Sequence, residues 1–179
     1  MLNRIKYRLK QLFFALTSKM SEEDHNLVHQ YLNIKESALF YRLPEYEQKH
    51  AVVVAQKMLK AAEGNQEADK RKITRLGLLH DIGKAAIRLS LYDKSIMVVM
   101  NRLLPPLYEN LAKKGIAESS PRIFRQFYVH KNHAKIGAEI LDRISEDKDI
   151  LEDVKNHDDK KIKSDDFYFN LLVKADNES

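Results

Sequence analysis

Leu78-Leu79-His80-Asp81-Ile82-Gly83-Lys84 closes a segment that begins near residue 67 and has the apolar spacing of a buried helix. Burying an unpaired carboxylate is costly, so Asp81 needs a cation or hydrogen-bond donors. A divalent metal would meet that need, with imidazole nitrogen and carboxylate oxygen as its ligands. Neighbouring helical residues point about 100° apart, so His80 and Asp81 reach one ion only where the helix ends, and Gly83 supplies that end. Taken alone, the pair has another interpretation: His80 and Asp81 could form hydrogen bonds at the helix end without binding a metal.

Other segments bring further potential ligands towards this pair. Each stands on or at the end of a predicted core-facing helix: His50, His133, His157 and Asp176. An isolated histidine on an apolar helix face is usually a hydrogen-bonded core residue. Several such positions around one His-Asp pair favour a metal site instead.

The spacing of apolar residues predicts an all-α chain. Ser21-Glu22-Glu23-Asp24 has the pattern of a capping box, and Pro44, Pro105-Pro106 and Pro121 stand where helices begin. The expected helices cover 21–33, 44–64, 67–81, two stretches within 90–115, one opened by Pro121, 147–157 and 164–176. No run alternates in the way that predicts a strand. The apolar run Ile96–Met100 with Leu103-Leu104 is expected in the core, within an interval that covers the metal site as a lid.

Composition narrows the class of protein. A chain of 179 residues fits one domain, perhaps with a short appendage, and the absence of cysteine excludes disulfide scaffolds, thiolate metal sites, iron–sulfur clusters and cysteine catalysis. No glycine-rich phosphate loop occurs. The pair His25 and His29 on a polar helix is expected to be solvated.

The net charge of +5 is concentrated at the N-terminus, because residues 1–20 hold five basic side chains and no acidic one. The other 159 residues hold 26 of each sign, which gives no strong nucleic-acid signal. We therefore divide the chain into a basic amphipathic helical segment over 1–33 and a helical domain over 34–179. Residues 1–19 either lie on an anionic membrane surface or dock on their own domain. The expected location is cytoplasmic, with a peripheral position at the inner membrane face if the first alternative holds.

The arrangement resembles the HD superfamily of metal-dependent phosphohydrolases, over residues 44–176. The residues that carry the resemblance are His50, the His80-Asp81-Ile82-Gly83-Lys84 stretch, His133 with Gly137, Asn156-His157 and Lys174-Ala175-Asp176. Within that superfamily the chain is similar to small stand-alone bacterial proteins with a Phe-Tyr-Val-His segment, here Phe127–His130, whose substrates are unassigned.

The resemblance implies an HD-like helical bundle with an extra basic N-terminal helix, and a metal site made by the ligands identified above. His50, His80, Asp81 and Asp176 would bind a primary ion, and Asp81 would bridge to a second ion held by His133 and His157. His130 competes with His133 for the third histidine position. Mn²⁺, Fe²⁺, Mg²⁺, Co²⁺ and Zn²⁺ all suit these donors.

The implied function is hydrolysis of a phosphate ester, in a nucleotide, phosphomonoester or phosphodiester, by a metal-activated water. Asp81 would act through the metals, and Lys84 could contact the substrate phosphate. The alternative is a non-catalytic module that binds a metal or nucleotide and acts as a sensor or regulatory interaction domain. Both alternatives give the protein a phosphorylated small molecule or nucleotide as its partner.

Overall fold

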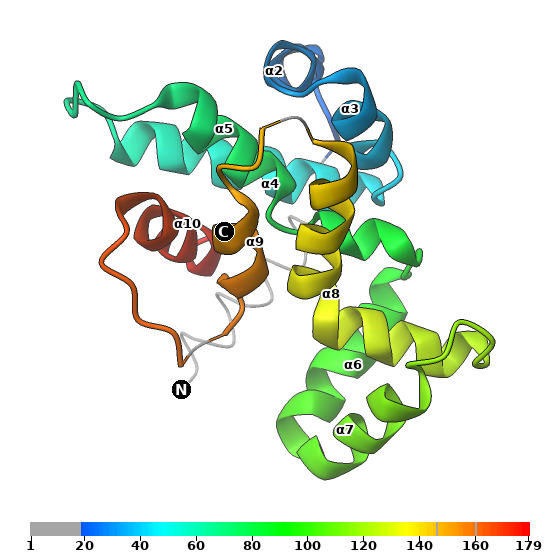
Figure 1. Cartoon of the computed structure of the whole chain (residues 1–179). Coiled ribbons are helices and arrows are strands. Elements are labelled where there is room, and N and C mark those ends of the chain that lie inside the picture. The colour runs from blue at the N-terminus through cyan, green and yellow to red at the C-terminus, as the bar shows by residue number, and fades with distance from the viewer. Residues whose placement is uncertain (1–18, 146, 160) are drawn as a thin grey trace.

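The computed structural model describes residues 19–145, 147–159 and 161–179, and it confirms the all-α prediction over these ranges, where no strand occurs. The elements run in the order α2 (Glu22–Tyr31), α3 (Ile34–Phe40), α4 (Glu45–Ala61), α5 (Lys70–Leu79), the 3₁₀ helix η1 (Ile82–Ala86), α6 (Leu91–Leu103), α7 (Pro105–Lys114), α8 (Arg122–Ile144), α9 (Leu151–Asn156) and α10 (Phe167–Asn177) (Figure 1). None of the described helices is long and apolar enough to cross a bilayer. The basic helix expected over residues 1–18 lies outside the described residues.

Helix α2 begins at the predicted capping box, where Ser21 and Asp24 exchange side-chain and backbone hydrogen bonds. The sequence analysis missed α3. Asn33 caps it with a second box, in which the Asn33 side chain accepts from the Glu36 backbone N–H and the Glu36 carboxylate accepts from that of Asn33. The α2 helix therefore stops at Tyr31, two residues before the expected end.

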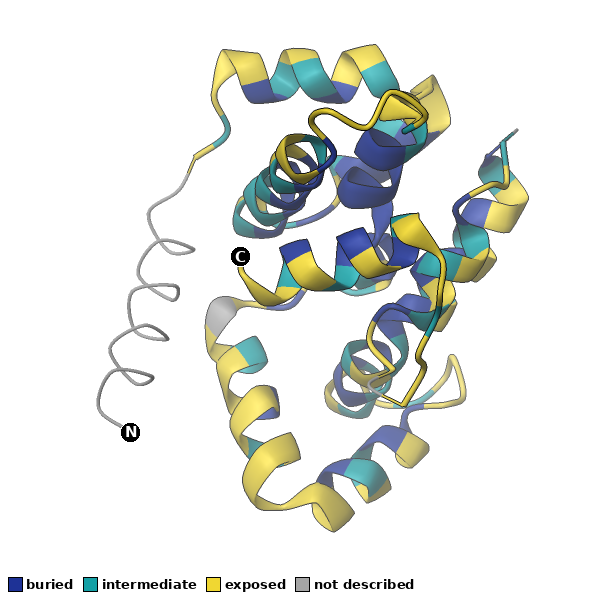
Figure 2. Cartoon of the chain, turned by 90° about the vertical axis from the view of Figure 1, so that its left-hand side faces the viewer, coloured by how far each residue is buried: buried dark blue, intermediate teal, exposed yellow. Residues whose placement is uncertain are grey.

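The main core is centred on the packed pair α4 and α5, and side chains from α2, α3, η1, α8, α9 and α10 join it (Figures 1 and 2). Its fully buried side chains include Phe40, Val54, Leu76, Leu141 and Leu172. Burial of apolar surface contributes about 25 cal/mol per Å², so the burial of these side chains favours folding. Val28 and Leu32 belong to the same cluster, so the α2 segment packs against the helical domain.

The α5 helix ends one residue before the His-Asp pair. Leu79 is its last residue, His80 is the C-cap, and Asp81 is the N-cap of η1. The sequence analysis expected Gly83 to end the helix. In the structure Gly83 lies inside η1 and packs against α8. A Cβ built at Gly83 would lie 1.9 Å from the His133 carbonyl oxygen and 2.6 Å from the Gly137 backbone nitrogen. Only glycine permits this approach, which brings Asp81 beside His133.

The helix predicted to open at Pro121 continues through His133 to Ile144 as α8, with a kink. Asn132 has φ −113° and ψ 15°, outside the helical region, directly before His133. The first half of α8 packs against α6 and α7 in a second, smaller core of Leu89, Met97, Tyr108, Ala112 and Phe127.

A buried ion-pair network joins α3 and α5 to the loop after α8. The Arg75 guanidinium donates to Glu36 Oε1 at 2.9 Å and to Asp149 Oδ1 at 2.9 Å, and Ser145 Oγ donates to Glu36 Oε1 at 2.7 Å. Arg75 and Glu36 are almost fully buried, whereas Asp147, which also pairs with Arg75, is 44% exposed.

We expect Glu36→Gln to lower the free energy of unfolding by about 2 kcal/mol, because it leaves part of the Arg75 charge buried without a counterion. Asp147→Asn is the matched control, since an exposed partner of the same arginine should cost less than about 1 kcal/mol. Urea denaturation measures both. Equal losses in the two variants would contradict the assignment of the buried pair as the important one.

Candidate metal centre

Six ionisable side chains from five separate segments meet on one side of the main core. They are His50 from α4, His80 and Asp81 from the α5–η1 junction, His133 from α8, His157 at the C-cap of α9 and Asp176 from α10. These are all the metal ligands expected from the sequence, and the structure brings every one of them into the cluster.

The Asp81 carboxylate stands at the centre of this group, and its two oxygens have different histidine neighbours. Oδ1 lies 3.1 Å from His133 Nε2 and 3.6 Å from His157 Nε2. Oδ2 lies 3.4 Å from His80 Nε2 and 3.8 Å from His50 Nε2. Each Asp81 oxygen therefore lies nearest a different pair of histidines, and the two pairs adjoin each other, since the His80 and His157 ring centroids are 5.1 Å apart.

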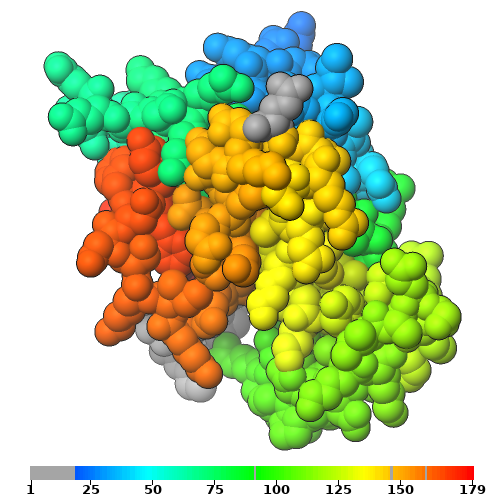
Figure 3. All heavy atoms as spheres, viewed as in Figure 1, coloured from blue at the N-terminus to red at the C-terminus, as the bar shows by residue number. Residues whose placement is uncertain are grey.

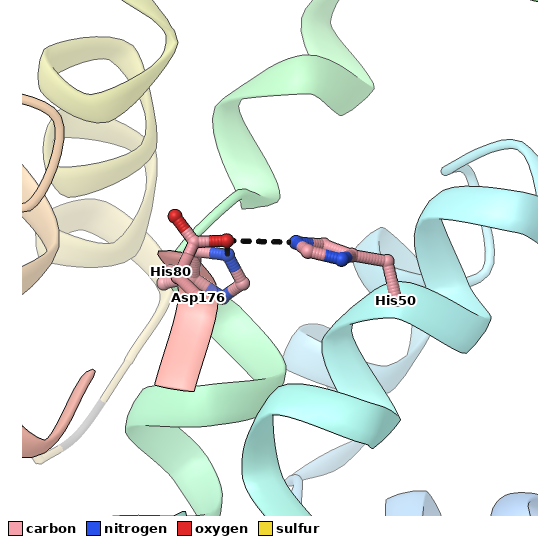
Figure 4. A group of neighbouring side chains, drawn as sticks. All are labelled: His50, His80 and Asp176. Atoms are coloured by element: carbon pink, nitrogen blue, oxygen red, sulfur yellow. Dashed lines mark hydrogen bonds and ion pairs between the residues drawn. The ribbon is translucent and has the colours of Figure 1, made fainter. Parts of the chain in front are cut away.

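Asp176 completes one of these sides. Its Oδ1 lies 3.0 Å from His50 Nε2 and 3.7 Å from His80 Nε2, so the three side chains converge on one point (Figure 4). Asp176 is on the last helix, 126 positions after His50 in the sequence.

Three of the histidines are held in the same way by their own helices. The Nδ1 atoms of His80, His133 and His157 lie 2.7–2.9 Å from the backbone carbonyl oxygens three residues earlier. A carbonyl only accepts, so Nδ1 must carry the proton and donate it. In the neutral ring Nε2 then presents a lone pair to the carboxylates, which also only accept. This backbone bond is the usual way in which a protein orients a metal-binding imidazole.

The Nε2 atom of His80 lacks a hydrogen-bond partner within the cluster, and it is fully buried. Burial opposes protonation of this ring, but the carboxylates of Asp81 and Asp176 outweigh burial and raise the pKa of His80 to about 10. Burial likewise opposes ionisation of Asp81, yet Lys84 and His80 hold its pKa well below the usual range. Both shifts show that the site stabilises a positive charge between the His80 Nε2 atom and the carboxylates of Asp81 and Asp176.

A divalent cation would supply such a charge. One donor atom each from His50, His80 and Asp176 lie within 4.8 Å of one another, and so do donors from His80, Asp81 and His157. Nitrogen and oxygen donors of this kind suit first-row divalent metals and Mg²⁺. The His/Asp clusters can thus hold a metal, and their chemistry does not select which one.

Comparison with protein families agrees with this geometry. The model of the HD domain matches residues 48–178, a range that includes all six cluster residues. The chain belongs to the HD domain family. HD domains are generally hydrolase-like and usually bind divalent metals. No curated protein and no solved structure matches the chain.

Beside the candidate metal ligands, this HD domain holds a second charged group, in which the sequence analysis singled out Lys84 but missed Glu47 and Lys94. The Glu47 carboxylate is buried, and it accepts from Lys84 Nζ at 3.3 Å and from Lys94 Nζ at 2.5 Å. Burial opposes ionisation of Glu47, but the two ammonium groups lower its pKa to about 2. Lys84 also contacts Asp81, so the Glu47 group adjoins the metal cluster. Glu47 stands one helical turn before His50, which was the available signal, whereas nothing local marks Lys94.

The competing ligand His130 points elsewhere. Its Nδ1 is 2.6 Å from the Tyr108 hydroxyl, and its own carbonyl accepts from His133 Nδ1. Burial, together with the charges of His133 and Lys84, lowers the pKa of His130 to about 4. His130 lines a small hollow with Glu47, Lys84 and Lys94, next to the cluster.

Proposed function

We propose that this HD domain is a metal-dependent phosphohydrolase that cleaves a phosphate ester in a nucleotide, phosphomonoester or phosphodiester. The observation that carries the proposal is the buried His80 Nε2, which has no hydrogen-bond partner in the described structure although two carboxylates lie within 4 Å, beside two lysine ammonium groups. A divalent cation would neutralise the negative charge of the carboxylates, and the positively charged lysines would attract a negatively charged phosphate.

We assign two ligand groups that share Asp81. His50, His80 and Asp176, with Asp81 Oδ2, would hold a primary ion, and Asp81 Oδ1 with His133 and His157 would hold a second. The different histidine neighbours of the two Asp81 oxygens support this division. When bound, divalent cations supply Lewis-acid chemistry, lowering the pKa of water and neutralising phosphoryl charge.

The chain's own residues would position the substrate. Two of the three N–H donors of the Lys84 ammonium face Asp81 and Glu47, which leaves one for a phosphate oxygen. Glu47 is a positioning residue in this scheme, because it holds Lys84 and Lys94 side by side at the edge of the cluster. The phosphate would bind over the two lysines, and its scissile bond would lie towards Asp81.

Turnover of a panel of phosphate esters, measured with added Mn²⁺, Mg²⁺, Co²⁺, Fe²⁺ or Zn²⁺, tests the function. The panel includes p-nitrophenyl phosphate, nucleoside mono- and triphosphates and cyclic dinucleotides. Release of phosphate or nucleotide that depends on the metal supports the enzyme. Stoichiometric metal and nucleotide binding without turnover would favour the sensor or regulatory module.

For Lys84→Ala we expect kcat/KM to fall about 10- to 150-fold, since one charge-assisted contact to phosphate contributes about 1.5–3 kcal/mol. Metal content should stay unchanged, because no ligand is removed. Lys60→Ala, an exposed lysine on α4, is the control and should behave as the parent. Undiminished turnover of the best substrate would make Lys84 a bystander, and loss of metal would assign it to the structure of the cluster.

A further inference from the structure

The α6–α7 lobe, defined here as residues 88–131, exposes most of the large apolar side chains on the molecule. Of the twelve that are exposed in the described part of the chain, nine lie between residues 92 and 123. The expectation that the run from Ile96 to Leu104 lies in the core is wrong, because Met97 alone is buried there. Figures 2 and 3 show these helices as a projecting lobe, with α6 largely exposed.

The exposed residues form an ordered surface. Tyr92, Ile96, Val99 and Leu103 follow one another at intervals of four, three and four, so they share one face of α6. The face continues into the turn Leu103-Leu104-Pro105-Pro106-Leu107, in which all five residues are exposed. Contiguous apolar surface of this kind on a soluble domain marks an interaction site.

The same lobe is strongly basic. Residues 88–131 carry eight basic and three acidic side chains, a net charge of +5. Two of those acids are already engaged, Asp93 in the cap of α6 and Glu109 with Lys131. The rest of residues 20–179 carries 18 basic and 23 acidic side chains, a net charge of −5. The net charge of zero outside the N-terminal segment is therefore the sum of a basic lobe and an acidic remainder of the domain.

The apolar stripe and the positive charge of the lobe together indicate which kind of partner it binds. A symmetric contact between two copies would bring two basic apolar surfaces together, and the basic segment 1–18 would meet the same repulsion. Nucleic acid would use the charge and leave the apolar stripe uncovered. A bilayer that contains anionic lipid satisfies both, because its boundary region accepts apolar side chains while its headgroups attract arginine and lysine.

We propose that the α6–α7 lobe docks on an anionic membrane surface, with the α6 stripe and the Leu103–Leu107 turn at the level of the acyl chains. Exposed basic side chains such as Arg102, Lys113 and Lys114 then contact the headgroups. A basic residue near such a surface contributes about 1 kcal/mol.

The place where the chain enters the described structure agrees with this proposal. The Met20 backbone N–H donates to Glu45 at the start of α4, and the next residue, Tyr46, donates to the Leu89 carbonyl just before α6. The described chain therefore begins next to a residue that contacts the start of α4, and the start of α4 in turn contacts the first residues of the lobe. Two weak membrane contacts on one chain reinforce each other, because the second binds at a high effective concentration.

The test is flotation of the full chain with vesicles of phosphatidylcholine, alone or mixed with phosphatidylserine. We expect binding to the mixed vesicles, weaker by at least about tenfold on the neutral ones. The double variant Leu103→Glu/Leu107→Glu should weaken binding to the mixed vesicles by at least about tenfold. Ile34→Glu is the matched control, since Ile34 is an apolar residue 89% exposed outside the lobe, and it should bind as the parent.

Circular dichroism and melting temperature show whether the variants fold, and Arg102→Glu/Lys113→Glu provides a second variant that leaves the apolar surface intact. That charge reversal should also weaken binding at least about tenfold. Full binding in both double variants, with loss only on deletion of residues 1–19, would overturn the proposal and assign the membrane contact to that segment. Dimers that dissociate in Leu103→Glu/Leu107→Glu, without vesicle binding by the parent, would assign the stripe to self-association. Preference for an oligonucleotide over mixed vesicles would likewise overturn it.

Discussion

Asp81→Asn is expected to remove bound metal and hydrolytic activity together, with metal affinity lowered more than about 100-fold. The loss of a residue that only orients a ligand costs 10- to 100-fold, and Asp81 faces both proposed ion positions directly. Asparagine has nearly the same shape, so the change tests the carboxylate charge with little effect on packing. Elemental analysis of protein purified without chelators, followed by titration with Mn²⁺, measures the result.

Asp176→Asn and His133→Ala are expected to affect the two proposed ions separately, whereas Asp81→Asn affects both. Within the described cluster the Asp176 carboxylate pairs with His50 and His80, so its loss should weaken the primary ion, and loss of His133 should weaken the second ion preferentially. Asp142→Asn, an exposed carboxylate on α8, is the control. Stoichiometric metal retained in Asp81→Asn would show that the metal binds elsewhere on the chain.

Gly83→Ala is expected to lower the free energy of unfolding by about 3 kcal/mol and to weaken metal binding as well. The added Cβ would lie 1.9 Å from the His133 carbonyl oxygen. That atom belongs to the backbone of α8 and cannot rotate away as a side chain would, so η1 and α8 must separate. Asp81 and His133 stand on the two sides of this contact, and their distance would increase with it.

Gly137→Ala provides the graded comparison across the same contact. Its Cβ would meet the Gly83 nitrogen at 3.0 Å and Ile82 Cγ2 at 3.3 Å, a tight fit that a small shift relieves. We expect a loss of about 1 kcal/mol and a smaller effect on metal affinity. Urea denaturation and metal titration of both variants test the order. A Gly83→Ala protein as stable as the parent would refute the role of this contact.

Local chemistry explains what could be predicted from the sequence. Apolar spacing and caps act within one or two helical turns, so the all-α class and most helices follow from the chain itself, although the Asn33–Glu36 cap of α3 was overlooked. The six cluster residues could also be identified, because burying histidine and aspartate at helix ends is costly unless they meet a partner. The resemblance to the HD superfamily supplied their grouping.

Only the tertiary structure determined how these residues face one another. The different histidine neighbours of the two Asp81 oxygens, the Glu47–Lys84–Lys94 group and the exposure of α6 all depend on packing between segments far apart in the chain. Lys94 reaches Glu47 across 47 positions, and Asp176 reaches His50 across 126. An apolar run such as Ile96–Met100 predicts a helix, but its burial depends on whether another element covers it. In this chain the long-range contacts complete the His/Asp cluster and leave the α6 stripe uncovered by the other described elements, and no local pattern encodes either result.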